Sequence, residues 1–179
     1  MTHTTDATTD MTTYATTYTT TYTARPIDPA VLKDLRTADD ADRPLVPFAD
    51  EEGGAPLRCC LRRSEPGERI ALVSYAPLPL GRRDGRRPGR VRRTGPGLHP
   101  HRRLPGPRPA RPPFPGAHRT VRRYSAEGHI LGGRLVENPE AFDDAFDEAF
   151  AEAFADPEVA LVHVRAVEYG CFLYEVRRA

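Results

Sequence analysis

The sequence has few of the residues that mark several classes of protein. Its 179 residues include three Cys and no apolar run of about 18, so we expect no transmembrane helix. Cys59 and Cys60 are adjacent and three thiols cannot all pair, which argues against a disulfide framework and favours a reducing cytoplasm. The N-terminus lacks a basic-then-apolar start, so we also expect no secretory signal. These absences favour a cytoplasmic protein with no membrane partner.

The formal net charge of +1 hides two segments of opposite sign. Residues 79–113 hold eleven Arg and one acid, about +10, whereas the rest of the chain is acidic, about −9. A hydrophobic content of 39% is low for a wholly folded chain. We therefore expect a disordered Thr-rich tail over residues 1–24 and a single domain over residues 25–179, interrupted by the segment 79–113.

Hydrophobic periodicity outside that segment predicts two helices and several short strands. One helix follows the N-cap Asp28 and ends near Thr37, and the other follows Asn138 and carries Phe at every fourth position, which is typical of a core face. Hairpins dominate, so we predict an α+β fold, mainly an antiparallel sheet with two helices and an irregular central segment. The predicted strands span residues 56–61, 69–75, 120–125, 130–136, 158–167 and 171–176.

The segment 79–113 has three interpretations. Clustered Arg could neutralise phosphates in a nucleic-acid-binding linker, but aromatic residues for stacking on bases are absent. A solvated linker of this length is uncommon inside a compact domain. The third interpretation is translation in the wrong frame, because one Lys against 25 Arg, one Asn and no Gln indicate a GC-rich gene, which yields Arg, Pro and Gly out of frame.

Degenerate back-translation separates the two shifted frames. Read one base later, the codons of residues 95–100 permit G-P-V-F-I-H, a good buried strand. The other shifted frame permits only Trp, Arg, Gly, Ser, Pro, Thr or Ala over residues 95–98, so no aliphatic strand is possible there. We therefore interpret residues 79–113 as out of frame, and we expect them to be irregular, with a gap or unpaired edge in the sheet where G-P-V-F-I-H would lie. On this interpretation a nucleic-acid partner is not expected.

Three in-frame blocks resemble an uncharacterised bacterial family, catalogued as domain of unknown function 1203. They are residues 56–77 (PLRCCLRRSEPGERIALVSYAP), 122–124 (RRY) and 156–179, which end in the most specific pattern, GCF-x-x-x-V-x-R-A. The family typically has a G-P-[VI]-F-[VI]-H segment, which this sequence lacks as written and which the shifted frame permits. The resemblance covers residues 25–78 and 114–179 and implies no activity.

Cysteines are the first candidates for chemistry. A nucleophilic thiolate needs a base or a positive field, and Arg58 lies beside Cys59 and Cys60, while His163 and Cys171 lie on neighbouring strands. The alternative is that these thiols are small core residues. No C-x-x-C or H-x-x-x-H spacing exists, so we predict no metal site and no cofactor.

Arginine and histidine supply a second candidate site. His163 and Arg165 alternate with Val162 and Val164, so they share one face of a strand. With other polar residues they could form an anion or small-molecule pocket, or only a solvated sheet face with ion pairs. The sequence predicts no specific activity; the first hypothesis is a small-molecule or protein-binding module, with a Cys enzyme or an Arg-rich nucleic-acid binder as alternatives. The candidate binding residues are Arg58, Cys59, Cys60, His163, Arg165, Glu168, Tyr169 and Cys171.

Overall fold

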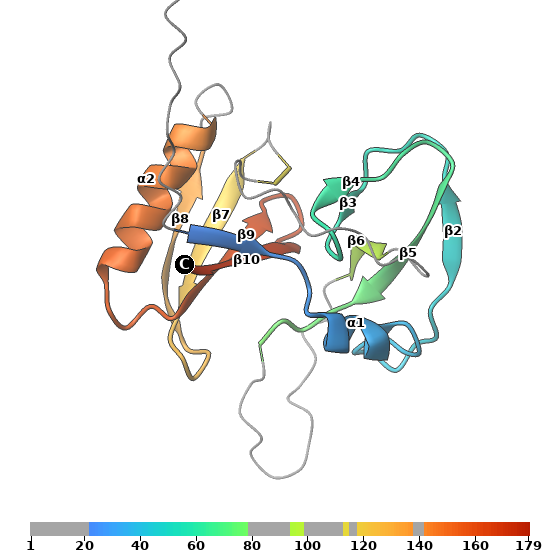
Figure 1. The fold of residues 1–179 in the computed structure, drawn as a ribbon, viewed down its shortest axis with the longest axis horizontal. Coiled ribbons are helices and arrows are strands. Elements are labelled where there is room, and N and C mark those ends of the chain that lie inside the picture. The colour runs from blue at the N-terminus through green and yellow to red at the C-terminus, as the bar shows by residue number, and fades with distance from the viewer. Residues whose placement is uncertain (1–21, 79–93, 99–112, 115–117, 138–141) are drawn as a thin grey trace, which may run out of the picture.

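Two lobes make up the protein (Figure 1), which we describe from a computed structural model over residues 22–78, 94–98, 113–114, 118–137 and 142–179. The larger lobe is a five-stranded antiparallel sheet in the order β1-β10-β9-β7-β8, with helix α2 across one face. These elements are β1 (Tyr22–Arg25), β7 (Arg119–Tyr124), β8 (Ile130–Val136), α2 (Phe142–Ala155), β9 (Leu161–Ala166) and β10 (Phe172–Arg178).

The smaller lobe combines a short helix with two small sheets. Strands β2, β5 and β6 form an antiparallel sheet in that order, and β3 pairs with β4. Its elements are α1 (Pro29–Leu35), β2 (Pro47–Asp50), β3 (Pro56–Leu57), β4 (Arg62–Arg63), β5 (Glu68–Ser74) and β6 (Thr94–Leu98). The predicted α+β class with two helices is confirmed, and no helix in the described ranges is long and apolar enough to span a bilayer.

The Phe stripe of α2 forms the core of the larger lobe. Phe146, Phe150 and Phe154 are buried in one apolar cluster with Val162 and Val164 of β9. Burial of large aromatic side chains at a four-residue spacing fixes α2 on the sheet, and losing one such ring typically costs about 3–5 kcal/mol. The predicted role of the stripe is therefore confirmed for these three residues, while the side chain of Phe142 lies outside the description.

A buried carboxylate holds the smaller lobe together. Asp39 is 4% exposed, and it accepts hydrogen bonds from the backbone amides of Ala41 (2.8 Å), Arg43 (3.0 Å) and Ser74 (2.9 Å). The Arg43 guanidinium lies 2.6 Å from its Oδ2 and also donates to Ser74 Oγ. Burial alone would raise the pKa of Asp39, but these donors outweigh it and hold the pKa at about 2. Asp39 thereby links the segment after α1 to the end of β5.

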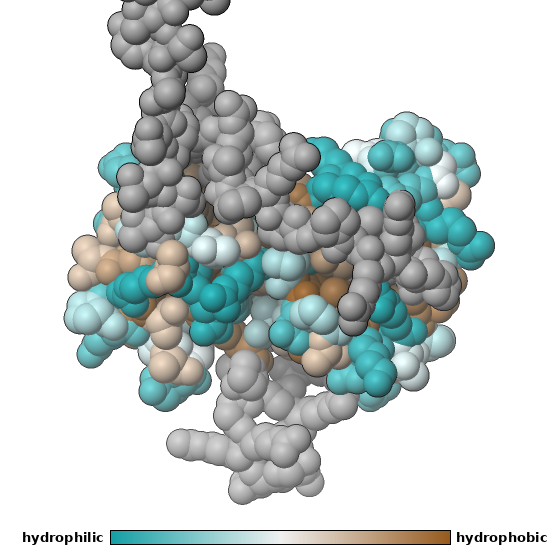
Figure 2. All heavy atoms as spheres, viewed as in Figure 1, coloured by the Kyte–Doolittle hydropathy of each residue, from teal (hydrophilic) through white to brown (hydrophobic). Residues whose placement is uncertain are grey.

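A register shift in β10 joins the two lobes. Phe172 lies opposite Arg165, whereas Tyr174 lies opposite Val164, which shows a bulge between them. In a regular strand Phe172 and Tyr174 would share one face of the sheet, but the bulge places them on opposite faces. Tyr174 enters the core under α2, and Phe172 packs with Leu32 of α1 in the cluster of the smaller lobe. In Figure 2, hydrophobic residues show in the middle of the molecule, with hydrophilic residues around them.

The structure shifts several predicted boundaries. Tyr22–Arg25 forms β1 beside β10, so the disordered tail predicted to end at residue 24 is wrong over residues 22–24. The aromatic Tyr22 and the β-branched Thr23 both favour a strand that pairs with the edge of β10. The strand predicted over residues 56–61 stops at Leu57, because the amide of Leu61 donates to Leu57 O (2.8 Å) and turns the chain back into β4. The second helix is described only from Phe142, so its expected cap at Asn138 lies outside the described residues.

The central segment is described only in small part. Thr94–Leu98 pairs with β5 as β6, so the expectation of an irregular segment with an unpaired sheet edge is wrong for these five residues. The edge of β5 offers hydrogen bonds that outweigh the poor strand propensity of two Gly and one Pro. Residues 79–93 and 99–112 lie outside the description, so the frame interpretation stays a prediction.

Asp39→Asn should lower the free energy of unfolding by about 2 kcal/mol at pH 7, because it removes the charge that Arg43 and three backbone amides stabilise. Since the pKa is lowered from 3.8 to about 2, the contribution is full above pH 3.8 and disappears as the pH falls through 2. Urea unfolding measures the loss. Asp34→Asn on the exposed side of α1 is the control and should change stability by less than about 0.5 kcal/mol. Equal effects of the two changes would contradict the role of Asp39.

The gene should carry two compensating indels, one near codons 78–79 and one between codons 108 and 114. Nucleotide sequencing of this gene across residues 75–118, and of related genes, measures this directly. Related genes that encode an Arg-, Pro- and Gly-rich segment in the same frame, without indels, would show that the segment is genuine.

Candidate ligand-binding site

Phe172 is the point at which most of the predicted site residues meet. The ring of His163 lies 5.0 Å from its ring, edge to face, and Arg165 lies directly opposite Phe172 on β9. Arg58 Nε donates a 3.0 Å hydrogen bond to Phe172 O. Cys59 packs against the same apolar cluster and Cys171 precedes Phe172 in the chain. The structure therefore brings together Arg58, Cys59, His163, Arg165 and Cys171.

The remaining predicted residues lie elsewhere. Cys60 packs against Leu57 and Ile70 in a separate cluster of the smaller lobe. Glu168 and Tyr169 are exposed at the turn between β9 and β10, and Tyr169 is 86% exposed. A side chain this far in solvent lines no pocket.

The geometry of Cys60 disfavours a thiolate. Its Sγ lies 3.9 Å from Cys59 Sγ, which donates to it, and Cys60 is 5% exposed. The contact with Cys59 and burial together raise the pKa of the Cys60 thiol. Cys171 is also buried.

Arg58 and Arg165 support the turn before β10. Both side chains are 6% exposed, and Arg165 Nε donates to Gly170 O at 2.9 Å while Arg58 Nε donates to Phe172 O. Burial lowers the pKa of Arg58 to about 10, and the charge of Arg119 acts in the same direction against the opposing effect of Cys171. The guanidinium is still charged at neutral pH. Both guanidinium groups therefore have a structural role in holding the turn.

His163 is a buried side chain whose ring nitrogens form no hydrogen bond within the described structure. Its side chain is fully buried, between the rings of Tyr124 (4.7 Å) and Phe172. Its Nε2 lies 3.7 Å from Glu175 Oε2, beyond hydrogen-bonding length, and neither ring nitrogen forms a hydrogen bond within the described structure. Burial lowers the pKa of His163 and Glu175 only partly offsets this, so the ring is neutral at neutral pH. Buried polar groups without hydrogen bonds are rare and costly.

Glu175 is the charged neighbour of that ring. Its Oε1 accepts a 2.5 Å hydrogen bond from Arg177 Nε. Burial would raise the pKa of Glu175, but His163 and Arg177 outweigh it and hold the pKa at about 2. The strand registers place Arg122 on one side of His163, Glu175 on the other, and Arg25 beyond Glu175. These four residues form a polar row across the face of the sheet opposite α2.

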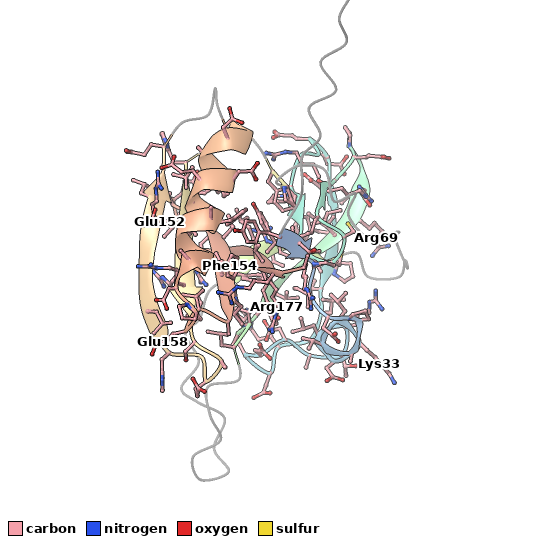
Figure 3. The ribbon with its side chains drawn as sticks, turned by 60° about the vertical axis from the view of Figure 1, so that its left-hand side comes forward. Lys33, Arg69, Glu152, Phe154, Glu158 and Arg177 are labelled. Carbon is pink, nitrogen blue, oxygen red and sulfur yellow. The ribbon has the colours of Figure 1, made fainter. Side chains whose placement is uncertain are left out.

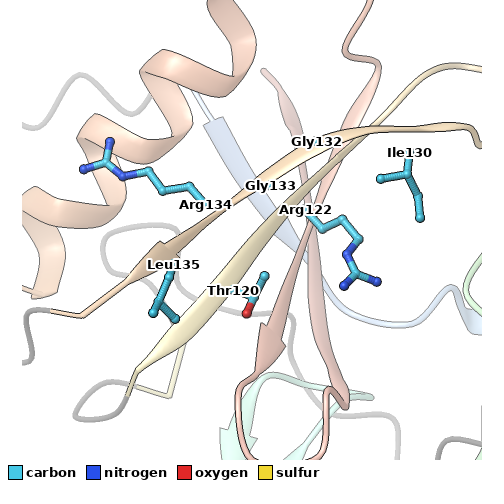
Figure 4. Close-up of a pocket in the computed structure, with 7 residues that line it drawn as sticks. All are labelled: Thr120, Arg122, Ile130, Gly132, Gly133, Arg134 and Leu135. Carbon is cyan, nitrogen blue, oxygen red and sulfur yellow. The ribbon is translucent and has the colours of Figure 1, made fainter.

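A hollow of about 440 Å³ lies on the same face, over β7 and β8 (Figure 4). Gly133 is opposite Arg122, and its missing side chain leaves the gap between Leu135 and Ile130. A Cβ at Gly133 would lie 3.0 Å from Val121 O, so a larger residue here would displace the neighbouring strand by a few tenths of an ångström. The hollow is lined by Thr120, Arg122, Ile130, Gly132, Gly133, Arg134 and Leu135.

Sequence reasoning missed Arg122 and Thr120 as site residues. The alternation of Thr120, Arg122 and Tyr124 indicated a common face, but nothing local showed that β7 lies beside β9. That pairing places Thr120 opposite Arg165 and Arg122 opposite His163. His163 and Arg165 therefore share one face as predicted, but both are buried, and the hollow on that face is lined by β7 and β8.

Comparison with known proteins identifies the family of this chain but assigns no activity. The chain belongs to the family described as protein of unknown function (DUF1203), whose model matches residues 54–178. No curated protein and no solved structure matches this chain. Within the described residues, no group of three His, Cys, Asp or Glu side chains is placed to hold a metal ion.

His163→Phe should remove part of the acid sensitivity of the fold. Because the pKa of His163 is lowered from 6.5, the unfolded chain binds a proton in mild acid that the folded chain does not. The free energy of unfolding is therefore unaffected by this group above pH 6.5. Below pH 6.5 it declines, by at most about 1.4 kcal/mol per pH unit. Phe keeps the ring contacts, does not titrate and leaves no nitrogen without a hydrogen bond, so the variant should be at least as stable at pH 7.

Urea unfolding of both proteins from pH 7 to pH 5 measures the difference. A decline of equal slope in the two proteins, or a strongly destabilised variant at pH 7, would contradict a buried neutral imidazole.

Proposed function

We propose that the protein binds a small anionic molecule with an apolar part, in the hollow over β7 and β8. The observation that carries this proposal is the Arg122 guanidinium, which points towards the exposed Ile130 (62% exposed), while Leu135 (46% exposed) lies farther along the same hollow. A planar guanidinium suits a carboxylate or phosphate, and the two aliphatic side chains suit an apolar body.

The charge of Arg122 is available to a ligand. Arg134, on the opposite face of the hairpin, is paired with Glu148 (3.3 Å) and Glu152 (2.7 Å) of α2. Arg122 forms no such ion pair with any residue in the described part of the chain. A guanidinium on a sheet face, half-buried and without a carboxylate, favours an anion from solution.

His163 supports the same face. Its neutral ring lies next to Arg122 in the register, and its two nitrogens lack hydrogen bonds within the described structure. Because His163 is fully buried and neutral, it neither contacts a ligand on Arg122 nor competes with it. A thiolate enzyme gains no such support, since Cys60 and Cys171 are buried and the pKa of Cys60 is raised.

Octanoate and octanol test the proposal, because they share an apolar chain and differ in the anionic group. Isothermal titration should show octanoate binding to the full chain and octanol binding at least about tenfold more weakly, the loss of one charge-assisted contact. Arg122→Gln should weaken octanoate binding by a similar factor and leave octanol unchanged.

Arg69→Gln is the matched control, because Arg69 is an exposed arginine on β5 of the other lobe (Figure 3). It should bind octanoate as the unmodified protein does. Equal binding of the two probes, or an equal loss from Arg69→Gln, would overturn the proposal.

A further inference from the structure

Strand β8 ends the larger sheet, and its outer edge has no strand beside it within the described structure. Exposed edges usually carry Lys, Pro or inward-pointing charge that prevents pairing with another chain. Strand β8 reads ILGGRLV, and its single charge, Arg134, turns back onto α2. Both Ile130 and Leu135 remain exposed on the other face. Among the residues that the structure describes, nothing therefore prevents an additional strand from pairing with this edge.

A row of carboxylates runs along α2 above that edge. Glu148 and Glu152 both contact Arg134, so this side of the helix faces β8. Asp144 is exposed one turn earlier and extends the same row at four-residue spacing. The exposed fractions of Glu148 and Glu152 are 70% and 56%, and Figure 3 shows Glu152 on the side of α2 towards β8. Two of these three carboxylates share the Arg134 guanidinium and Asp144 adds a third negative charge, which leaves this flank acidic.

The two faces of an added strand would thus meet different surroundings. Side chains on the α2 face would meet the acidic row, and alternate side chains would meet Ile130 and Leu135. We propose that the β8 edge binds an extended segment of a partner protein, with basic residues on one face and apolar residues on the other. Backbone pairing would supply affinity, and the two faces would fix orientation and specificity.

Charge argues against a second copy of this chain as the occupant. Pairing of two β8 strands about a twofold axis would continue one sheet across both copies and bring their α2 helices to the same face. The two rows of Asp144, Glu148 and Glu152 would then approach each other with only two Arg134 side chains to compensate. A basic segment gains from the same carboxylates.

The experiment uses a seven-residue acetylated peptide of alternating Val and Lys, and a Val/Glu peptide of the same pattern. The full chain should bind the Val/Lys peptide at least about tenfold more tightly, and more weakly at high salt, because the contacts are exposed ion pairs. Hydrogen exchange should show new protection of the β8 amides.

The double variant Asp144→Asn/Glu152→Gln should weaken binding of the Val/Lys peptide. The control double variant Glu51→Gln/Glu52→Gln changes two carboxylates in an exposed turn of the smaller lobe and should leave this binding unchanged. Leu135→Lys adds a charge on the other face and should weaken binding as well. Arg122→Gln should leave peptide binding intact, so failure of the anion site and failure of this edge are distinguishable.

Equal binding of the two peptides, an equal effect of the control pair, or protection confined to other strands would overturn the proposal. So would sedimentation showing a dimer that Leu135→Lys dissociates, since a second copy would then occupy the edge.

Discussion

The bulge at Phe172 is the constraint on which the arrangement of the two lobes depends. Regular alternation would place Phe172 and Tyr174 on one face of β10, but the register shift turns Tyr174 under α2 and Phe172 towards α1. The Phe172 ring also contacts Tyr75 (5.5 Å), which follows β5. One strand thereby supplies core residues to both lobes, and Arg58 holds the carbonyl group at the bulge. Without the extra residue that the bulge inserts between Phe172 and Tyr174, both rings would lie on one face, and one of the two cores would lack an aromatic ring.

The bulge also decides which polar groups are accessible. By covering His163, Phe172 removes the imidazole from water and lowers its pKa, and the two arginines that hold the turn are buried with it. The hollow on this face lies beyond these buried groups, over β7 and β8. The polar row from Arg25 through Glu175 and the neutral His163 ends at Arg122, which lines the hollow.

Local patterns in the sequence predict most of the larger lobe and little of the contact between lobes. The Phe spacing of α2 and the alternation of Val162 to Arg165 depend only on the period of one element, so helix, strand and common face follow from the letters alone. Asp39 could not be recognised as a buried anchor, since its donors come from Arg43 and from Ser74 far along the chain. Arg122 was missed for the same reason, because its neighbours are set by strand order.

Both proposed sites depend on the register of the β7–β8 hairpin. Alternate residues of β8 point to opposite faces, so Arg134 meets α2 while Leu135 borders the hollow. A slip by one residue would exchange these environments, placing an aliphatic side chain against the carboxylates and a second guanidinium in the hollow. The close approach at Gly133 and the register shift between Arg123 and Tyr124 oppose such a slip, because neither fits a displaced partner. Gly133 of β8 is therefore better understood as a residue that favours this register than as a weak point of the strand.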